Sequence, residues 1–388
     1  MNFLPYCSIN TNEICSFDED VPRSPEVRVM LTMMKKSHNT SSAKLTAVDL
    51  FSGCGAVSQG LKNAGFQVLA AVDSNPVAGK TYKLNHQGVK FFEADITTFD
   101  PKNFKITPRL LDLLVICAPC QPFSNQNRHK DPKNKDRFLI LQAIRFAEYL
   151  LPKLIFFENV PGLVGENNGS ILDELRNGLK NVGYLCGETQ KINAADFQVP
   201  QRRIRCVMFA SRIGELPLFP PRLKNTKRRT VRDAIGDLPA LHAGEKTKDI
   251  LHFARRHLPQ ALERLEHIPK NGGSRFALPP YLELPCHKNC KGYPDVYGRM
   301  AWDEVAPTLT TGCTDVTRGR FAHPEDNRAI SLREAARLQT FPDDYTFCGN
   351  ASQIAVQIGN AVPVELAYSI GRAVREILER GSQTPPTV

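Results

Sequence analysis

Residues 44–65 read KLTAVDLFSGCGAVSQGLKNAG and contain a complete strand–turn–helix pattern. An apolar run ends at Leu50 and is followed by a glycine-containing turn at 51–55. Three apolar residues then recur at helical spacing, namely Val57, Leu61 and Ala64. Gly65 stands where a glycine commonly terminates a helix. The stretch predicts a buried strand, a tight turn and an amphipathic helix.

The same alternation continues to about residue 210. Further strands are expected over residues 68–72, 91–92, 113–117, 154–157 and 204–210. Helices are expected after Asn75-Pro76, over 141–151 and after Ser170, because these positions combine capping residues with apolar residues at helical spacing. Strands that alternate with helices form a parallel sheet with helices on both faces. We therefore expect a doubly wound, mostly parallel, Rossmann-like α/β fold.

Chemically capable residues follow several of these strands. Asp73, Asp95, Cys120 and Glu158 each come at or just past the end of an apolar run. In open α/β sheets, ligands bind outside the carboxyl ends of the strands. These four side chains are therefore expected to converge on one site, although they are far apart in the sequence.

The rest of the chain divides by composition. Residues 1–43 are expected to be a poorly ordered leader, and 44–215 the main part of the α/β domain. Residues 216–322 are rich in proline, glycine and basic residues and predict a smaller, irregular domain. A capping box at Ser331 begins the return to the α/β domain over 323–380, which leaves a tail at 381–388.

Composition excludes several classes of protein. The chain has 388 residues, of which 41% are hydrophobic and 23% charged, which is ordinary for a globular protein. No apolar run approaches the roughly 18 residues of a membrane-spanning helix. The net charge of +10 favours an anionic partner such as nucleic acid. Eleven scattered cysteines and a start without signal-peptide features predict free thiols in a reducing compartment, which indicates the cytoplasm.

The glycine turn and the acid after the next strand suggest a nucleotide-like ligand. Gly53 and Gly55 would let the backbone approach the ligand, and Asp73 could hold ribose hydroxyls. Ser58 stands where a dehydrogenase fingerprint would have its third glycine. The turn alone could equally be a tight strand–helix connection.

Cys120 lies between Pro119 and Pro122, so its thiol is expected on a rigid, exposed turn at a strand end. Such a thiol can act as a nucleophile. Cys117 and Cys120 also have the spacing of a dithiol redox pair, but the upstream nucleotide-like turn argues against that interpretation.

Glu158 follows four apolar residues and is expected to be partly desolvated, which favours a protonated carboxyl able to donate to a ring nitrogen. It could instead be a strand-end acid that pairs with a lysine. Strand alternation would point Arg203 and Arg205 to the same side, where guanidinium groups suit a carboxylate, a phosphate or a base carbonyl. A solvated basic strand entry is the alternative for the arginines.

Taken together, the motifs resemble the DNA cytosine-5 methyltransferase family of bacterial restriction–modification systems. The resemblance runs from about residue 44 to 380. It rests on the segments 49–60, 73, 95, 119–124, 158–160, 201–205, 331–345 and 357–363, with further likeness at 297–302 and 306–310. Asp73 departs from the glutamate usual in the family, and Ala56-Val57 replaces a common glycine.

The resemblance implies a methyl transfer from S-adenosylmethionine to carbon 5 of cytosine in a specific double-stranded DNA sequence, through a flipped-out base. Cys120 would be the nucleophile, and Glu158, Arg203 and Arg205 the other catalytic residues. The donor pocket would contain Phe51, Gly53, Gly55, Asp73, Asp95, Pro119, Asn360 and Val362. DNA contacts are expected from Gln201, Arg228, Arg229 and Arg299.

The family further implies a monomer without a metal, acting beside a separate restriction endonuclease and associated with the nucleoid in a bacterium. Cys286-His287 and Cys290 are closely spaced, but no second ligand pair accompanies them, so zinc is not expected. An RNA cytosine methyltransferase on the same fold and a catalytically silent DNA-binding module remain as alternatives. The sequence does not reveal the recognition site.

Overall fold

A computed structural model describes residues 44–119, 135–164, 169–219, 222–223, 228–288, 292 and 294–381. The expectations for the leader at 1–43, for most of the tail and for Cys120 lie outside these residues.

The described residues contain one eight-stranded sheet with the order β3-β2-β1-β4-β5-β8-β6, and β7 also pairs with β8. Its strands are β1 (Thr46–Leu50), β2 (Gln67–Asp73), β3 (Lys90–Glu93), β4 (Leu113–Ile116), β5 (Leu154–Asn159), β6 (Leu185–Cys186), β7 (Gln190–Asn193) and β8 (Ile204–Ser211). Neighbours from β3 to β5 pair in parallel, and β8 runs antiparallel to β5, β6 and β7. The prediction of a mostly parallel α/β sheet is confirmed.

The α-helices are α2 (Ala56–Asn63), α3 (Pro76–Asn85), α4 (Gln142–Leu150), α5 (Gly169–Asn181), α6 (Val231–Ile235), α7 (Pro259–His267), α8 (Leu332–Leu338), α9 (Ala351–Asn360) and α10 (Val364–Gly381). Local sequence signals determine where several of these helices begin and end. Gly65 has a φ of +90° just after α2. The side chain of Asn75 accepts from two backbone N–H groups of α3. Ser331 and Glu334 form the expected capping box of α8.

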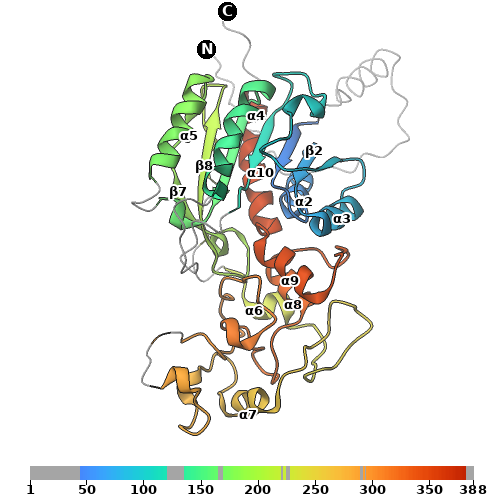
Figure 1. The fold of residues 1–388 in the computed structure, drawn as a ribbon, viewed down its shortest axis with the longest axis vertical. Helices are drawn as coiled ribbons and strands as arrows, with labels where there is room; N and C mark the ends of the chain where they lie inside the picture. Colours follow the sequence, from blue (N-terminus) through green and yellow to red (C-terminus); the bar gives the residue numbers. More distant parts are fainter. Residues whose placement is uncertain are drawn as a thin grey trace, which may run out of the picture. The chain divides into compact units, whose positions relative to one another are not determined.

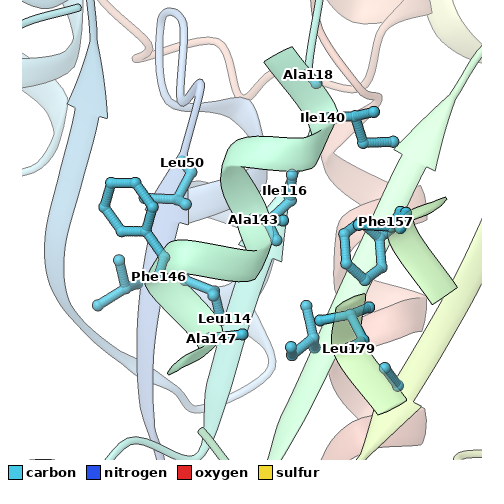
Figure 2. Packing of buried hydrophobic residues seen from close by; sticks show 14 of the residues in the cluster. Leu50, Leu114, Ile116, Ala118, Ile140, Ala143, Phe146, Ala147, Phe157 and Leu179 are labelled. Atoms are coloured by element: carbon cyan, nitrogen blue, oxygen red, sulfur yellow. The ribbon is translucent and has the colours of Figure 1, made fainter. Parts of the chain in front are cut away.

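Period-2 alternation along the strands divides the core between the two faces of the sheet. Leu114 and Ile116 of β4 pack with residues of α4 and α5 (Figures 1 and 2). Leu113 and Val115 of the same strand belong to a second cluster with α2 and α10. Fully buried Phe146, labelled in Figure 2, contributes about 1.5–3 kcal/mol by leaving water. Helices on both faces are the doubly wound arrangement that the sequence predicts.

The region 216–322 has few helices. Hydrophobic clusters and the hydrogen bonds of buried arginines hold it together. Helix α6 shares a core cluster with α8, which follows in the C-terminal part of the chain. A smaller cluster includes Leu265 of α7 and Tyr297. Arg299 is 1% exposed and donates to the carbonyls of Leu265 and Ile268, at 2.7 and 3.2 Å. The expected domain boundaries at 216 and 322 remain a prediction.

The sequence missed β6, β7, α6, α7 and α9, and it placed the start of α5 two residues late. In the described part of the chain, no helix is long and apolar enough to cross a membrane.

Candidate methyl-donor and base-binding site

The turn after β1 has an unusual backbone. Phe51, Gly53 and Gly55 all have positive φ angles, of 58°, 53° and 95°. A Cβ placed on Gly53 would meet nothing within 4 Å, so open space borders the turn there. A Cβ on Gly55 would lie 2.3 Å from Nε2 of His86, so only glycine fits that position.

Asp73, at the end of β2, is bonded directly to this turn. Its Oδ2 accepts from the backbone N–H of Gly53 at 2.8 Å, and its Oδ1 accepts from that of Asn75 at 2.8 Å. Burial raises the pKa of Asp73, and the two backbone donors act in the opposite direction. The structure thus brings two of the predicted donor-pocket residues, Gly53 and Asp73, into contact.

Asp49 lies beneath the turn and is completely buried. Its Oδ2 accepts from the hydroxyl of Ser58 at 2.7 Å, and Ser58 lies 2.7 Å from the hydroxyl of Tyr82. Within the described residues, Oδ1 of Asp49 has no hydrogen-bond partner. Burial raises the pKa of Asp49 to about 7.

Glu158 is buried near the end of β5 and pairs with an arginine. Nε of Arg205 donates to its Oε1 at 2.8 Å, and the two side chains are 10% and 8% exposed. Asn159 is also buried, and its Nδ2 donates to the carbonyl of Ala118 at 3.2 Å. Ala118 lies two residues before Cys120 in the sequence, so Asn159 connects the end of β5 to the segment that leads to Cys120.

Arg203 is buried, and its guanidinium donates to two backbone carbonyls. Its Nη1 donates to the carbonyl of Leu309 at 3.1 Å and its Nη2 to that of Gly359 at 3.0 Å. It therefore joins the entry of β8 to the end of α9. Its direct catalytic role stays a prediction.

Two residues expected to contact DNA, Gln201 and Arg299, are enclosed in this structure. Gln201 is completely buried, donates to Gln339 at 3.0 Å and accepts from the N–H of Leu309 at 3.0 Å. Arg299 is 1% exposed, and its guanidinium donates to the carbonyls of residues 265, 268, 323, 325 and 326. Both side chains hold elements of the fold together here, and their contacts with DNA remain predictions.

Arg228 and Arg229 are half-buried, and Arg228 forms an ion pair with Asp196. Their contacts with DNA remain predictions.

The other expected donor-pocket residues lie at strand or helix ends. Asp95 is exposed past β3, where the N–H and hydroxyl of Thr97 donate to its carboxylate and lower its pKa. Asn360 is exposed at the end of α9, and Val362 is buried just after it. Pro119 is exposed at the edge of the described residues. Next to Asn360, the carbonyl of Gln357 accepts a weak bond from the Cys54 thiol at 3.8 Å, which places this part of α9 against the glycine turn.

Four residues around the site were not singled out from the sequence, namely His86, Tyr345, Asn159 and Gln339. The last three lie inside segments on which the resemblance rests. The sequence therefore identified their motifs but did not predict which residues they contact. His86 had no sequence signal, because nothing local links a histidine at the end of α3 to the turn after β1. Among the described residues, no group of three or more histidine, cysteine or acidic residues could hold a metal ion.

Comparisons with known proteins agree with this architecture. The C-5 cytosine-specific DNA methylase family matches residues 45–376. The Type II methylase M.HgiDII of Herpetosiphon aurantiacus is 38% identical over 342 residues, which cover 86% of this chain and 95% of that protein. The Type II methyltransferase M1.HphI of Haemophilus parahaemolyticus is 35% identical and covers 85% of this chain and 86% of its own.

The same fold occurs in the crystal structure of a DNA modification methyltransferase encoded in an E. coli prophage. The TM-score is 0.68 at 23% identity, and the match covers 86% of this chain and 99% of the other. Since the family match spans most of the chain and close relatives align along nearly their whole length, the chain belongs to the C-5 cytosine-specific DNA methylase family and is a DNA (cytosine-5) methyltransferase.

Proposed function

We propose that the protein transfers a methyl group from S-adenosylmethionine to carbon 5 of a cytosine within a specific double-stranded DNA sequence, by covalent addition of Cys120 to a flipped-out base. The observation that carries this proposal is the buried Glu158–Arg205 pair, at the same edge of the sheet as the glycine turn and Asp73. Family membership supports the cytosine chemistry.

The residues of the turn fit the methyl donor. The open space beside Gly53 leaves room for a ligand close to the backbone, and Asp73 has two carboxylate oxygens already fixed by backbone donors. Oxygens held in this way can accept further hydrogen bonds from ribose hydroxyls without rearrangement. Phe51, Gly55, Asp95, Pro119, Asn360 and Val362 would line the remainder of the pocket. When bound, the donor supplies an electrophilic methyl group on its sulfonium.

Carbon 5 of cytosine is a weak nucleophile and must be activated. The thiolate of Cys120, which lies outside the described residues, would form a bond to carbon 6 of the ring. Glu158 would donate a proton or hydrogen bond to ring nitrogen 3, which accepts the electron density displaced by this addition. Carbon 5 then takes the methyl group as the carbon–sulfur bond of the sulfonium breaks, which leaves a neutral thioether. Release of the carbon 5 proton to water, expulsion of the Cys120 thiolate and return of the nitrogen 3 proton to Glu158 restore the aromatic ring.

Contacts within the protein would hold Glu158 and the segment before Cys120 in a fixed geometry. Arg205 fixes the carboxylate of Glu158 through a charge-assisted bond in a desolvated setting. Asn159 fixes the carbonyl of Ala118, two residues before the nucleophile. Such supporting bonds restrict the reacting groups to one geometry, which lowers the entropic cost of reaching the transition state.

The basic region at 216–322 would grip phosphates and read bases, with Arg228 and Arg229 among the candidate contacts. We further propose a monomer, without a metal, that works in the cytoplasm on nucleoid DNA beside a separate restriction endonuclease, as the Type II names of its relatives suggest.

Methyl transfer from labelled donor to duplex DNA and to tRNA tests the proposal in one experiment. We expect label in DNA, a covalent protein–DNA adduct with a mechanism-based cytosine analogue, and neither product with Cys120→Ser. Label in tRNA alone would favour the RNA reaction and overturn the DNA proposal.

A further inference from the structure

Two residues from distant parts of the chain hold adjacent carbonyls of the glycine turn. Tyr345, which follows α8, donates its hydroxyl to the carbonyl of Cys54 at 2.5 Å. Nε2 of His86, at the end of α3, lies 2.9 Å from the carbonyl of Gly55 and 3.0 Å from the hydroxyl of Tyr345. All four partners lie within one buried cluster beneath the turn.

The hydrogen-bond directions of this cluster follow from its chemistry. A carbonyl oxygen only accepts, so His86 must carry its proton on Nε2 to bond Gly55. The hydroxyl proton of Tyr345 is used on Cys54, so its oxygen is free to accept from the same Nε2–H. His86 is therefore a neutral donor, and its burial, which lowers its pKa to about 3, keeps it neutral at all ordinary pH values.

The cluster fixes the backbone of the turn next to Gly53, on the side proposed to face the donor pocket. Gly53, whose N–H is held by Asp73, comes directly before the two clamped carbonyls. The carbonyl of Gly55 also accepts the first bond of α2, from the N–H of Gln59 at 2.9 Å. Glycine loses more backbone entropy on ordering than any other residue type, so a turn that contains glycines is costly to hold in one conformation. The bonds from His86 and Tyr345 offset that cost before a ligand arrives.

We propose that His86 and Tyr345 are positioning residues for the methyl donor, which clamp the Cys54 and Gly55 carbonyls and so hold the turn in its binding conformation. The inference rests on the proposed function, because it assigns the turn to S-adenosylmethionine. It also makes the donor site depend on a segment nearly 300 residues downstream, since Tyr345 and Cys54 are separated by 291 positions. Neither residue touches the donor itself in this proposal.

Tyr345→Phe is the direct test, because it removes only the hydroxyl. The ring would keep its packing against Phe341 and Phe347, whose ring centroids lie 4.9 and 5.3 Å away. Loss of the bond to Cys54 should weaken S-adenosylmethionine binding about 5- to 30-fold by calorimetry, because leaving a buried carbonyl without its hydrogen bond costs about 1–2 kcal/mol. The affinity for DNA and kcat at saturating donor should stay within twofold.

Tyr184→Phe is the matched control. Tyr184 is 3% exposed, and its hydroxyl also donates to a backbone carbonyl, that of Pro152, at 2.8 Å. It lies before β6 and away from the glycine turn, so its loss should lower the melting temperature without changing donor affinity.

His86 supplies a second test through its tautomer. His86→Gln places an amide N–H near the position of Nε2, whereas His86→Asn places one near Nδ1. Donor binding should be largely retained by the glutamine variant and weakened at least fivefold by the asparagine variant. If His86 had only a structural role, donor affinity would instead fall in each variant in proportion to the fall in its melting temperature.

The outcomes separate this inference from the function on which it rests. If the wild-type protein binds no S-adenosylmethionine, the proposed function and the positioning role of His86 and Tyr345 are both overturned. If it binds the donor and Tyr345→Phe binds it equally well, or no worse than Tyr184→Phe does, the clamp alone is overturned.

Discussion

Nε of Arg205 lies 2.8 Å from Oε1 of Glu158, and the bond joins the antiparallel strands β8 and β5 inside the protein. In the pairing of these strands Glu158 stands opposite Val207, so Arg205 reaches it diagonally from two positions earlier on β8. Strand β8, the antiparallel neighbour of β5, thus delivers a cation to the carboxylate at the site. This contact links the motif at 158–160 directly to the one at 201–205.

Glu158→Gln keeps the shape of the side chain and removes its charge and its acid function. We expect the rate of methyl transfer to fall about 10²- to 10⁴-fold, because proton donation to the ring is lost. Donor affinity should be unchanged. Single-turnover kinetics with labelled donor measure the first quantity and calorimetry the second.

Glu334→Gln is the control for the loss of a buried ion pair. Glu334 pairs with Arg328 in the protein interior, and both are at most 1% exposed. Its replacement should lower the melting temperature at least as much as Glu158→Gln and leave the transfer rate of the folded protein nearly intact. Transfer near the wild-type rate by Glu158→Gln would remove Glu158 from the mechanism.

Cys120→Ser should abolish methyl transfer while donor binding is retained, since a serine hydroxyl is not ionised near neutral pH. Cys117→Ser is the internal control and should stay active. If both variants lose activity together, a dithiol reaction would explain the data better than a single nucleophile.

Asp49 should make stability depend on pH. Its carboxyl pKa is raised to about 7 in the folded protein, against an ordinary value of 3.8, so the folded state binds a proton that the unfolded state has lost. The stabilising contribution of this proton is complete below about pH 4 and is lost as the pH rises through 7, by at most about 1.4 kcal/mol per pH unit. Denaturant titrations between pH 5 and 8 measure it.

Asp49→Asn removes this titration but keeps an acceptor for Ser58. The free energy of unfolding of the variant should change less over the same pH range. Equal pH dependence in the two proteins would show that other groups are responsible.

Much of the fold was predictable because its signals are local. The strand–turn–helix pattern at 44–65, the Asn75 cap and the Ser331 capping box each depend on neighbours within a few residues, and each is confirmed. The antiparallel direction of β8 was not predictable in this way, because an apolar strand has the same sequence pattern in either direction.

The limits of sequence reasoning at the site are equally physical. A motif identifies residues that act together but not which atoms face solvent. Arg299 and Gln201 have polar side chains of the kind that bind DNA, yet both are enclosed by backbone groups that need hydrogen-bond partners. The contact between His86 and Gly55 joins positions 31 residues apart and follows from the packing of α3.

Arg299→Lys tests the structural assignment of that arginine. Lysine keeps the charge but cannot reproduce a planar set of bonds to several carbonyls. We expect a lower melting temperature and an unchanged slope of log affinity for DNA against log salt. Arg228→Ala combined with Arg229→Ala should instead make that slope shallower by about 1 to 2, because phosphate contacts release counterions. A shallower slope for Arg299→Lys would show that Arg299 does contact DNA.

Exchange of residues 216–322 for the corresponding region of a relative with a different target tests where sequence recognition lies. The segment is attached to the α/β domain by specific contacts that the hybrid must preserve, namely Arg228 with Asp196, Asp237 with Arg337, Asp249 with Arg333, and the Leu309 N–H with Gln201. Because the glycine turn, Asp73 and Glu158 all lie outside the exchanged segment, the hybrid should keep its donor affinity and its chemistry. Bisulfite sequencing of DNA from cells that express it should reveal methylation at the relative's target. A folded, active hybrid that still methylates the original sites would place recognition elsewhere and make the division at 216 and 322 wrong.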